Sequence, residues 1–257
     1  MTTRLQKLVA ATTSSQLYRS IFRHEYVDSV RNRALEVTGN VFLHLHPIAI
    51  PRHALKVHFT FCLGGLTFLL FLIETVTGVL LMFYYRPVPE YAYVDMKTLE
   101  HAVEYGMTLR NLHRWGAHLM VICVMLHMLR VFLTGSYRPP REFNWVVGVN
   151  LLVLTLLLSF TGYLLPWDQL AFWAVTVGTN MAAATPLLGA EGPFHELLGV
   201  TVRNDVRFLL LGDMRVGPSA LLRFYVLHCV GLPLVAAVLM MVHFWRVRKD
   251  GGISRPL

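Results

Sequence analysis

The stretch RNLHRWGAHLMVICVMLHMLRVF, residues 110–132, decides the fold. Residues 115–129 within it hold no Lys, Arg, Asp or Glu, which predicts a membrane-spanning helix. His113 and His127 lie fourteen positions apart. At about 100° and about 1.5 Å per residue, this interval puts both imidazoles on one face, about 21 Å apart along the axis. Because the apolar core of a bilayer is about 30 Å thick, one histidine should lie toward each side of the membrane.

A second apolar stretch, FYVLHCVGLPLVAAVLMMVHFW, carries His228 and His243, fifteen positions apart. If the two helices lie side by side, His113 can pair with His228, and His127 with His243. Two neutral imidazoles that face each other are the ligands of a bis-histidine b-type haem. A single histidine on an apolar face is usually a structural residue, but two pairs with matching intervals favour two haems.

The composition is that of a membrane protein, with 55% hydrophobic and 15% charged residues among 257. The net charge of +8 is explained by basic residues that flank spanning helices, so we expect no nucleic-acid partner. Cys62, Cys123 and Cys229 all lie within predicted spans, and no disulfide framework is indicated.

We predict three regions along the chain. Residues 1–58 form an N-terminal segment with an amphipathic surface helix around 17–35. Residues 59–247 form a bundle of four membrane-spanning helices, and residues 248–257 form a tail. The spans are expected at about 59–84, 110–133, 145–165 and 220–245. Four histidines near the first span could form a metal cluster, but the favoured interpretation is interfacial histidines that flank the span: His44, His46, His53 and His58.

The basic residues predict the orientation. Four spans put both termini on one side, and the segments on that side hold 15 of the 23 lysines and arginines. Basic residues concentrate on the cytoplasmic side of membrane proteins. Both termini should therefore be cytoplasmic in an energy-transducing membrane such as a bacterial inner membrane. His113 and His228 would then lie toward the outside, and His127 and His243 toward the inside.

Glycines in the other two spans repeat the histidine interval. Gly64 and Gly78 are fourteen apart in the first span, and Gly148 and Gly162 are fourteen apart in the third. Glycine lets a flat macrocycle approach the backbone, although small residues also serve ordinary helix packing. We therefore predict an all-α membrane four-helix bundle that encloses two stacked b haems.

Arginines near the histidines are candidates for pairing with haem propionates, or else ordinary charged residues at helix ends. These are Arg110, Arg114, Arg130 and Arg223.

The intervals in the two histidine helices differ by one residue. Fourteen residues fall about 40° short of four full turns, whereas fifteen exceed them by about 60°. Gly231 and Pro233 lie between His228 and His243, and proline removes a helical hydrogen bond. We predict a kink or a wide turn there that restores the register.

Six motifs give the chain a resemblance to the cytochrome b subunit of cytochrome bc complexes, in its short four-helix form, cytochrome b6. They are FCLGG (61–65), TGVLLMFYYRP (77–87), LHRW (112–115), TGYLLPWDQLAFWAV (161–175), LRFYVLH (222–228) and HFWRVRKDGGISRPL (243–257). The resemblance implies that His113 and His228 bind an outer, low-potential haem, and that His127 and His243 bind an inner, high-potential haem.

Cys62 resembles the single cysteine that attaches a third haem covalently in the b6 form. The alternative is a small packed hydrophobic residue. By this resemblance, Arg248 and Lys249 could meet the propionates of the third haem.

The resemblance also implies a function, carried out only in the assembled complex, a quinol:cytochrome c or plastocyanin-type oxidoreductase. Quinol is oxidised at the outer face, one electron passes to a Rieske iron–sulfur protein, and the other crosses to a quinone at the inner face, with proton translocation. The wall of the outer quinol pocket would include Tyr163, Pro166, Trp167 and Phe172.

The Pro-Glu-Trp-Tyr segment that completes this pocket in the family is missing from the chain. In the b6 form it belongs to a separate small subunit, which is therefore expected as a partner. Further expected partners are a c-type cytochrome, membrane lipid and a second copy in a homodimeric complex. The N-terminal segment and the loop at 187–217 are longer than in the family pattern.

Two other classes compete with this interpretation. One is a b-type haem membrane anchor of an external hydrogenase or dehydrogenase, which would lack the paired glycines and the PWDQ loop. The other is a haem-free transporter or structural bundle.

Overall fold

The computed structural model describes residues 3–16, 18, 29–40 and 50–253, in two units divided after Ile50. The first unit holds α1 (Arg4–Thr13) and α3 (Val30–Gly39), and the Ser29 side chain caps α3 by accepting a hydrogen bond from the amide of Asn32. The surface helix predicted around 17–35 falls largely outside the described residues, although its last part coincides with the start of α3.

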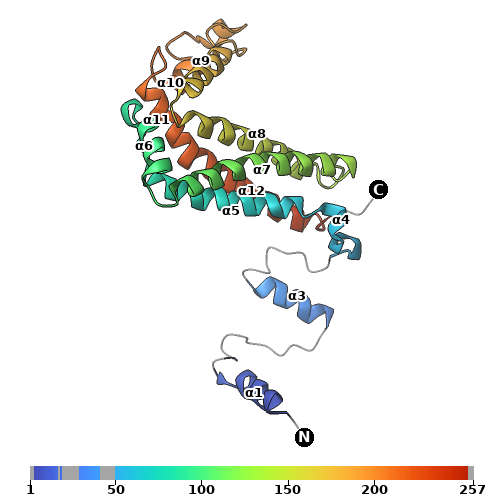
Figure 1. Cartoon of the computed structure of the whole chain (residues 1–257). Coiled ribbons are helices and arrows are strands. Elements are labelled where there is room, and N and C mark those ends of the chain that lie inside the picture. The colour runs from blue at the N-terminus through green and yellow to red at the C-terminus, as the bar shows by residue number, and fades with distance from the viewer. Residues whose placement is uncertain (1–2, 17, 19–28, 41–49, 254–257) are drawn as a thin grey trace. The chain divides into compact units, whose positions relative to one another are not determined.

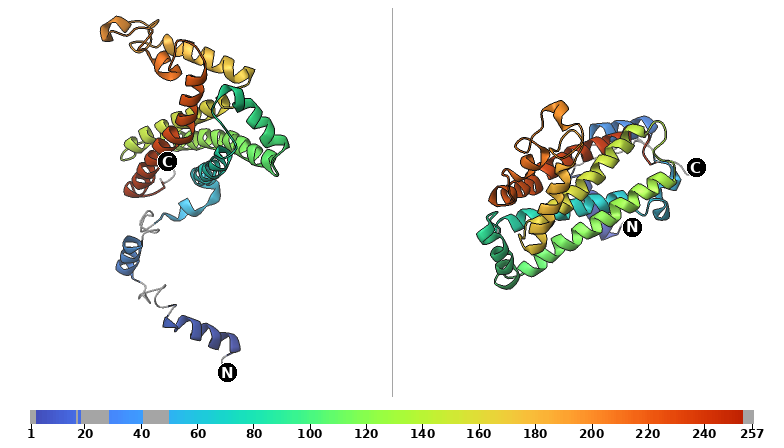
Figure 2. Two further views of the ribbon diagram at one scale, coloured as in Figure 1. Left: turned by 90° about the vertical axis from the view of Figure 1, so that its left-hand side faces the viewer. Right: turned by 90° about the horizontal axis from the view of Figure 1, so that it is seen from above.

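Four long apolar segments run side by side in the second unit (Figures 1 and 2). They are α5 (Leu63–Met82), α7 (Gly106–Leu133), α8 (Glu142–Leu164) and the continuous segment α11 (Pro218–Val226), η4 (Leu227–Gly231) and α12 (Leu232–Lys249). Each is long and apolar enough to cross a membrane. The described residues contain no strand, so the all-α four-helix prediction is confirmed.

The first span begins later than residue 59. A short helix, α4 (Val57–Thr60), precedes it, and Phe61 and Cys62 both adopt left-handed backbone conformations with φ of 50° and 52°. Such angles cannot continue a right-handed helix, so α5 starts only at Leu63. Cys62 therefore lies in the turn that precedes α5.

The last span contains the predicted irregularity. Residues 227–231 form a π-helical turn, η4, and Pro233, which has no amide proton to donate, follows it in the first turn of α12. A π-turn takes one more residue per hydrogen-bonded turn than an α-helix. The prediction of a wide turn is confirmed, and the segment continues as a helix on both sides of it.

At one end of the bundle, short helices cover the ends of the spans (Figure 1). They are α6 (Pro89–His101), α9 (Gln169–Ala183), η3 (His195–Leu198) and α10 (Val206–Leu211). Asp168 and Asp205 cap α9 and α10 by accepting hydrogen bonds from backbone amides. Beneath them lies a buried apolar cluster of Leu164, Val175, Leu211, Ala220 and Phe224.

Polar contacts fix α6 to this end. The Arg86 guanidinium donates hydrogen bonds to Asp95, which lower the pKa of that buried carboxyl and keep it ionised. Tyr85 donates from its hydroxyl to the carbonyl oxygen of Leu165 at 2.5 Å, and burial raises the pKa of this phenol. The link after α5 is therefore held against the end of α8.

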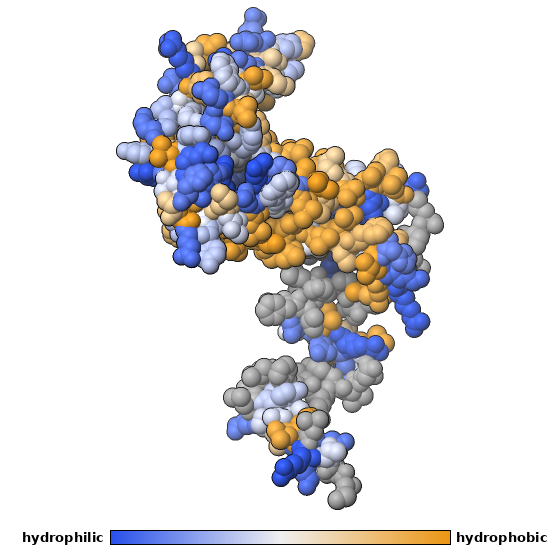
Figure 3. Space-filling view, viewed as in Figure 1, coloured by the Kyte–Doolittle hydropathy of each residue, from blue (hydrophilic) through white to orange (hydrophobic). Residues whose placement is uncertain are grey.

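The opposite end carries η2 (Arg52–Leu55), α4, the 134–141 turn and the end of α12 (Figure 1). Arg246 contacts Asp250 at 3.0 Å, and Arg141 donates to the carbonyl oxygen of Asp250 at 3.0 Å. Between the two ends the bundle presents a hydrophobic surface, with hydrophilic side chains gathered over α6 (Figure 3). This distribution matches a bilayer-spanning body with polar ends.

Candidate functional site

The four predicted histidines form two pairs across the bundle. The ring centres of His113 and His228 are 6.3 Å apart, and those of His127 and His243 are 6.4 Å apart. The two rings of each predicted pair therefore lie close together. Two metal–nitrogen bonds of about 2.0 Å, with about 1.1 Å from each nitrogen to its ring centre, require a separation of about 6.2 Å. Both pairs therefore fit a metal ion held between two imidazoles.

A glycine from a neighbouring helix faces each histidine. A Cβ added at Gly64 would lie 3.3 Å from Cε1 of His127, and one at Gly78 would lie 3.2 Å from Cε1 of His113. On α8, a Cβ at Gly162 would lie 2.6 Å from Cε1 of His228, and one at Gly148 would lie 4.0 Å from Cε1 of His243. The bundle therefore has two levels, one with His113 and His228 and the other with His127 and His243. The glycines repeat the interval of fourteen because one glycine of each pair lies at each level, as predicted.

The π-turn explains how two histidines fifteen positions apart in one helix can pair with two histidines fourteen positions apart in the other. His228 lies within η4, so the extra residue of the His228–His243 interval is taken up beside the histidine itself. The ring separations of 6.3 Å and 6.4 Å show that both pairs meet equally well. A straight α-helix would rotate one imidazole about 100° out of register.

The comparisons with known proteins agree with this geometry. The family profile described as cytochrome b/b6/petB matches residues 50–251. The chain is 43% identical to a cytochrome b6 of Heliobacterium mobile over 212 residues, 82% of this chain and 91% of the relative. It is 42% identical to a cytochrome b6 of Euglena gracilis over 208 residues, 81% of this chain and 88% of the relative.

The chain belongs to the cytochrome b/b6 family. A solved hyperthermophilic respiratory complex III contains a similar fold, with a TM-score of 0.67 and 29% identity over 77% of this chain and 49% of that one. The chain is thus a membrane cytochrome b subunit of the bc or b6f type, and the family binds b-type haem. The paired imidazoles and the glycines that face them fit that group.

The two levels of this cytochrome b differ in their polar contacts. At the level of His113 and His228, which the predicted orientation makes the outer level, Nδ1 of His113 lies 2.8 Å from Oγ1 of Thr77 and 3.0 Å from Oε2 of Glu74. Nδ1 of His228 lies 3.1 Å from Oγ1 of Thr161. At the inner level, neither His127 nor His243 has a hydrogen-bond partner at Nδ1 among the described residues.

Sequence reasoning missed these partners. A signal for the threonines was present, because Thr77 and Thr161 each stand directly before a glycine that faces a histidine, in the dipeptides 77–78 and 161–162. No comparable local pattern points to Glu74, whose contact depends on how α5 packs against α7.

The arginines divide into two groups. Arg110 pairs with Glu100, and Arg223 donates to the carbonyl oxygen of Leu209, so each already has a protein partner. In contrast, Nε and Nη2 of Arg130 are buried without a hydrogen-bond partner among the described residues. Arg130 is therefore the arginine best prepared to receive an anionic group near His127.

The remaining two arginines are more open. Arg114 is exposed and lies over the ring of Trp115 at 5.7 Å. Arg248 is half-buried near the end of α12.

The residues predicted to wall a quinol pocket lie at the junction of α8 and α9. Trp167 adopts a positive φ of 52° and contacts Phe172, with ring centres 6.2 Å apart. Pro166 is half-buried beside them, whereas the Tyr163 side chain is half-exposed on α8. The structure therefore brings the ring of Trp167 in the PWDQ loop together with the ring of Phe172 on α9.

The three cysteines are free and occupy different environments. Cys123 is buried against Leu70 and Met120 in mid-bundle. Cys62 is exposed and stands two residues before Gly64, which faces His127. Cys62 thus lies near the inner level, as the sequence predicted.

The metal-cluster interpretation of the N-terminal histidines finds no support in the described part of the chain. His44 and His46 lie outside the described residues. Among those described, no group of three or more His, Cys, Asp and Glu side chains is arranged to hold a metal ion.

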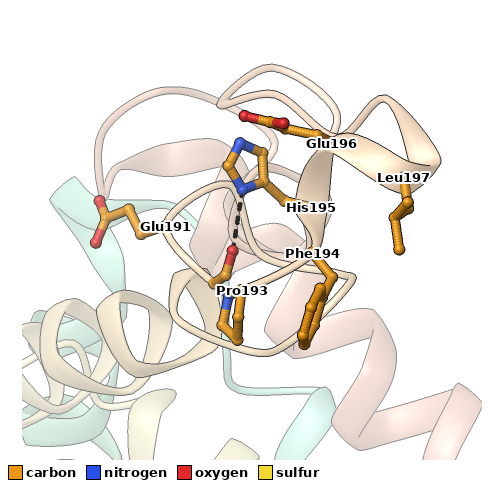
Figure 4. Close-up of a pocket in the computed structure, with 7 residues that line it drawn as sticks. Glu191, Pro193, Phe194, His195, Glu196 and Leu197 are labelled. Carbon is orange, nitrogen blue, oxygen red and sulfur yellow. Dashed lines mark hydrogen bonds between the residues drawn. The ribbon is translucent and has the colours of Figure 1, made fainter.

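A shallow pocket of about 450 Å³ lies in the long loop after α9, lined by residues 191–197 (Figure 4). His195 turns its Nδ1 toward the carbonyl oxygen of Gly192 at 3.0 Å, so this imidazole is engaged within its own loop. The pocket contains none of the predicted site residues.

The role of the π-turn can be tested by changing its length. Deleting Val230 gives a fourteen-residue interval, which a regular α-helix accommodates with the same rotation as the His113–His127 interval. We expect the haem-to-protein ratio of the purified variant to equal that of the wild-type protein.

The matched control inserts one alanine after Val230. The sixteen-residue interval leaves an imidazole about 100° out of register, so the haem-to-protein ratio should fall. Full haem content in the insertion variant, or haem loss in the deletion variant, would contradict this account of the turn.

Proposed function

We propose that this cytochrome b carries electrons across the membrane in a quinol-oxidising complex. Quinol is oxidised at the outer side, one electron passes to a Rieske iron–sulfur protein, and the other crosses to a quinone at the inner side, coupled to proton translocation. The observation that carries the proposal is the presence of two histidine pairs at two depths of one bundle, each imidazole faced by a glycine.

In this proposal His113 and His228 ligate the outer b haem, and His127 and His243 ligate the inner one. When bound, the haems supply one-electron carriers at the two depths. Arg130 holds an inner propionate through its buried, otherwise unpartnered N–H groups, while the exposed Arg114 serves the outer one. Arg110 and Arg223 act indirectly, because Glu100 and the Leu209 carbonyl already occupy their guanidinium groups.

The outer quinol pocket is walled by Trp167 and Phe172, with Pro166 and Tyr163 beside them. The contact between the two rings and the half-exposed phenol support an apolar wall with one polar group. A separate small subunit would supply the Pro-Glu-Trp-Tyr segment that this chain lacks. The final electron acceptor would be a c-type cytochrome or plastocyanin.

The orientation and assembly follow the same proposal. The excess of basic residues in the terminal segments and the 134–141 turn supports a cytoplasmic location of both termini. The broad hydrophobic surface of the spans is suited to lipid and to a second copy in a homodimeric complex (Figure 3).

Cys62 attaches a third haem through a single thioether at the inner side. Two observations support this role: the thiol is exposed, and it sits at the second of two consecutive left-handed residues, a conformation that costs about 1–3 kcal/mol for non-glycine residues. Such strain is a common feature of functional sites. Arg248 and Lys249, at the end of α12, are positioned to meet propionates of this haem.

The ligand assignment predicts that single histidine substitutions remove different haems. His127→Ala should lose the inner, high-potential b haem and His228→Ala the outer, low-potential one, because each pair loses one of its two ligands. Reduced-minus-oxidised spectra during a redox titration identify the component that disappears. His118→Ala, an exposed histidine on α7, is the control and should keep both haems. Loss of the same haem in both variants would refute the pairing.

Purification of the intact complex tests the overall function. A tag on this chain should bring down a Rieske subunit, recognised by its iron–sulfur signal, together with quinol:cytochrome c reductase activity. Co-purification of a nickel or molybdenum subunit without the Rieske protein would instead identify the chain as a membrane anchor of a dehydrogenase or hydrogenase.

The covalent haem predicts a simple electrophoretic result. A thioether survives denaturation whereas histidine–iron bonds do not, so the polypeptide should show haem-linked peroxidase staining on a denaturing gel. Cys62→Ser should abolish the stain while both b haems remain in the native spectrum. Cys123→Ser, which removes a buried thiol, is the matched control and should retain it. An unstained wild-type band from haem-replete membranes would contradict the covalent haem and indicate that Cys62 is a small packed hydrophobic residue.

A further inference from the structure

Glu74 is the only charged residue within α5, where it lies between the two levels of glycines that face the histidines. Its side chain is only 15% exposed. An ionisable side chain inside a membrane is costly and usually has a specific function. Neither the haem ligation nor the quinol pocket described above accounts for it.

The carboxyl group contacts one of the outer histidines. Oε2 of Glu74 lies 3.0 Å from Nδ1 of His113, from the side opposite to any metal bound at Nε2. Thr77, one turn further along α5, approaches the same Nδ1 at 2.8 Å. Because the Thr77 hydroxyl donates to the carbonyl oxygen of Ile73 at 2.7 Å, it can only accept from His113. The ring therefore carries its proton on Nδ1, with Nε2 free to bind a metal.

The backbone of α7 makes room for this carboxyl group. Gly116 is buried, and a Cβ at that position would overlap Oε1 of Glu74. Oε1 is itself buried without a hydrogen-bond partner among the described residues. The close approach of Glu74 to His113 thus depends on a glycine one turn after the histidine on the facing helix.

The inner level has no equivalent of this contact. His127 and His243 have no Nδ1 partner among the described residues, and the partner of His228 is a neutral hydroxyl at 3.1 Å. A hydrogen-bond acceptor at Nδ1 makes the metal-binding nitrogen more basic, and this favours the oxidised metal. The carboxyl oxygen therefore acts on the outer level alone.

We propose that Glu74 is a positioning residue for His113: its carboxyl group, which lies 3.0 Å from Nδ1, orients the outer ligand and lowers the reduction potential of the outer haem relative to the inner one. This inference rests on the proposed role of His113 as a haem ligand. Thr77 accepts the hydrogen bond from Nδ1, and Gly116 provides the space that lets the Glu74 carboxyl group lie beside it.

The test is a redox titration of the purified complex with the variant E74Q. The substitution replaces one carboxyl oxygen with an NH₂ group, which cannot accept a hydrogen bond and can face Nδ1 in its place. The ferrous-to-ferric ratio of the outer haem at a fixed potential should rise at least threefold, which is about 28 mV at about 59 mV per tenfold change for one electron. The reduction potential of the inner haem in the same sample should not change.

Two further variants separate the hydrogen bond from other effects. E74D keeps the carboxyl group but withdraws it from Nδ1, and should shift the outer haem in the same direction as E74Q. G116A leaves Glu74 unchanged and displaces its carboxyl group sterically, with the same expected shift. T75V alters the neighbouring exposed polar residue on α5 and should shift neither haem.

Several results would overturn the proposal. They are a wild-type outer potential in both E74Q and G116A, a wild-type potential in E74D, and equal shifts of both haems. The first would mean that the contact does not tune the haem, the second that charge alone matters, and the third that the variants disturb the whole bundle. Failure of the proposed function is a separate outcome, because it would appear as the absence of two b haems in the wild-type complex.

Discussion

The facing of two imidazoles across the bundle, repeated at two depths, is the constraint on which the rest of the structure depends. Ring centres must stay 6.3–6.4 Å apart at both levels, so the two histidine helices must keep the same rotation over four turns. At each level the neighbouring helix presents a glycine close to the Cε1 edge of the ring, where a larger residue would crowd the imidazole. The π-turn at Leu227–Gly231 reconciles a fifteen-residue interval with these requirements.

The positions of the charged side chains depend on their depth in the bundle. Because unpartnered polar groups are costly in a bilayer, most charged side chains lie at the two ends, where Arg86 binds Asp95 and Arg246 binds Asp250. The exception is Glu74, which lies beside a histidine in mid-bundle. The covering helices α9 and α10 share a buried apolar cluster with the adjoining ends of α8 and α11.

The two levels of the site are built alike but surrounded differently. The outer histidines contact Thr77, Thr161 and Glu74, whereas the inner histidines lack Nδ1 partners among the described residues and lie near Cys62 and Arg130. A bundle with two identical ligand pairs can therefore give its two levels different chemical properties through neighbouring side chains alone. Directional electron transfer across a membrane requires such a difference.

The sequence by itself determined the four spans, the histidine pairs and the glycine levels, because apolar length and helical periodicity are local properties that can be read along one helix. It also located the irregularity near Gly231, although only the structure showed a π-turn rather than a kink. The left-handed turn at Phe61 and Cys62, the partners that occupy Arg110 and Arg223, and the contact of Glu74 with His113 were decided by the tertiary structure. Each of these depends on how separate segments pack together, and no spacing along a single helix encodes which side chain of its neighbour lies opposite.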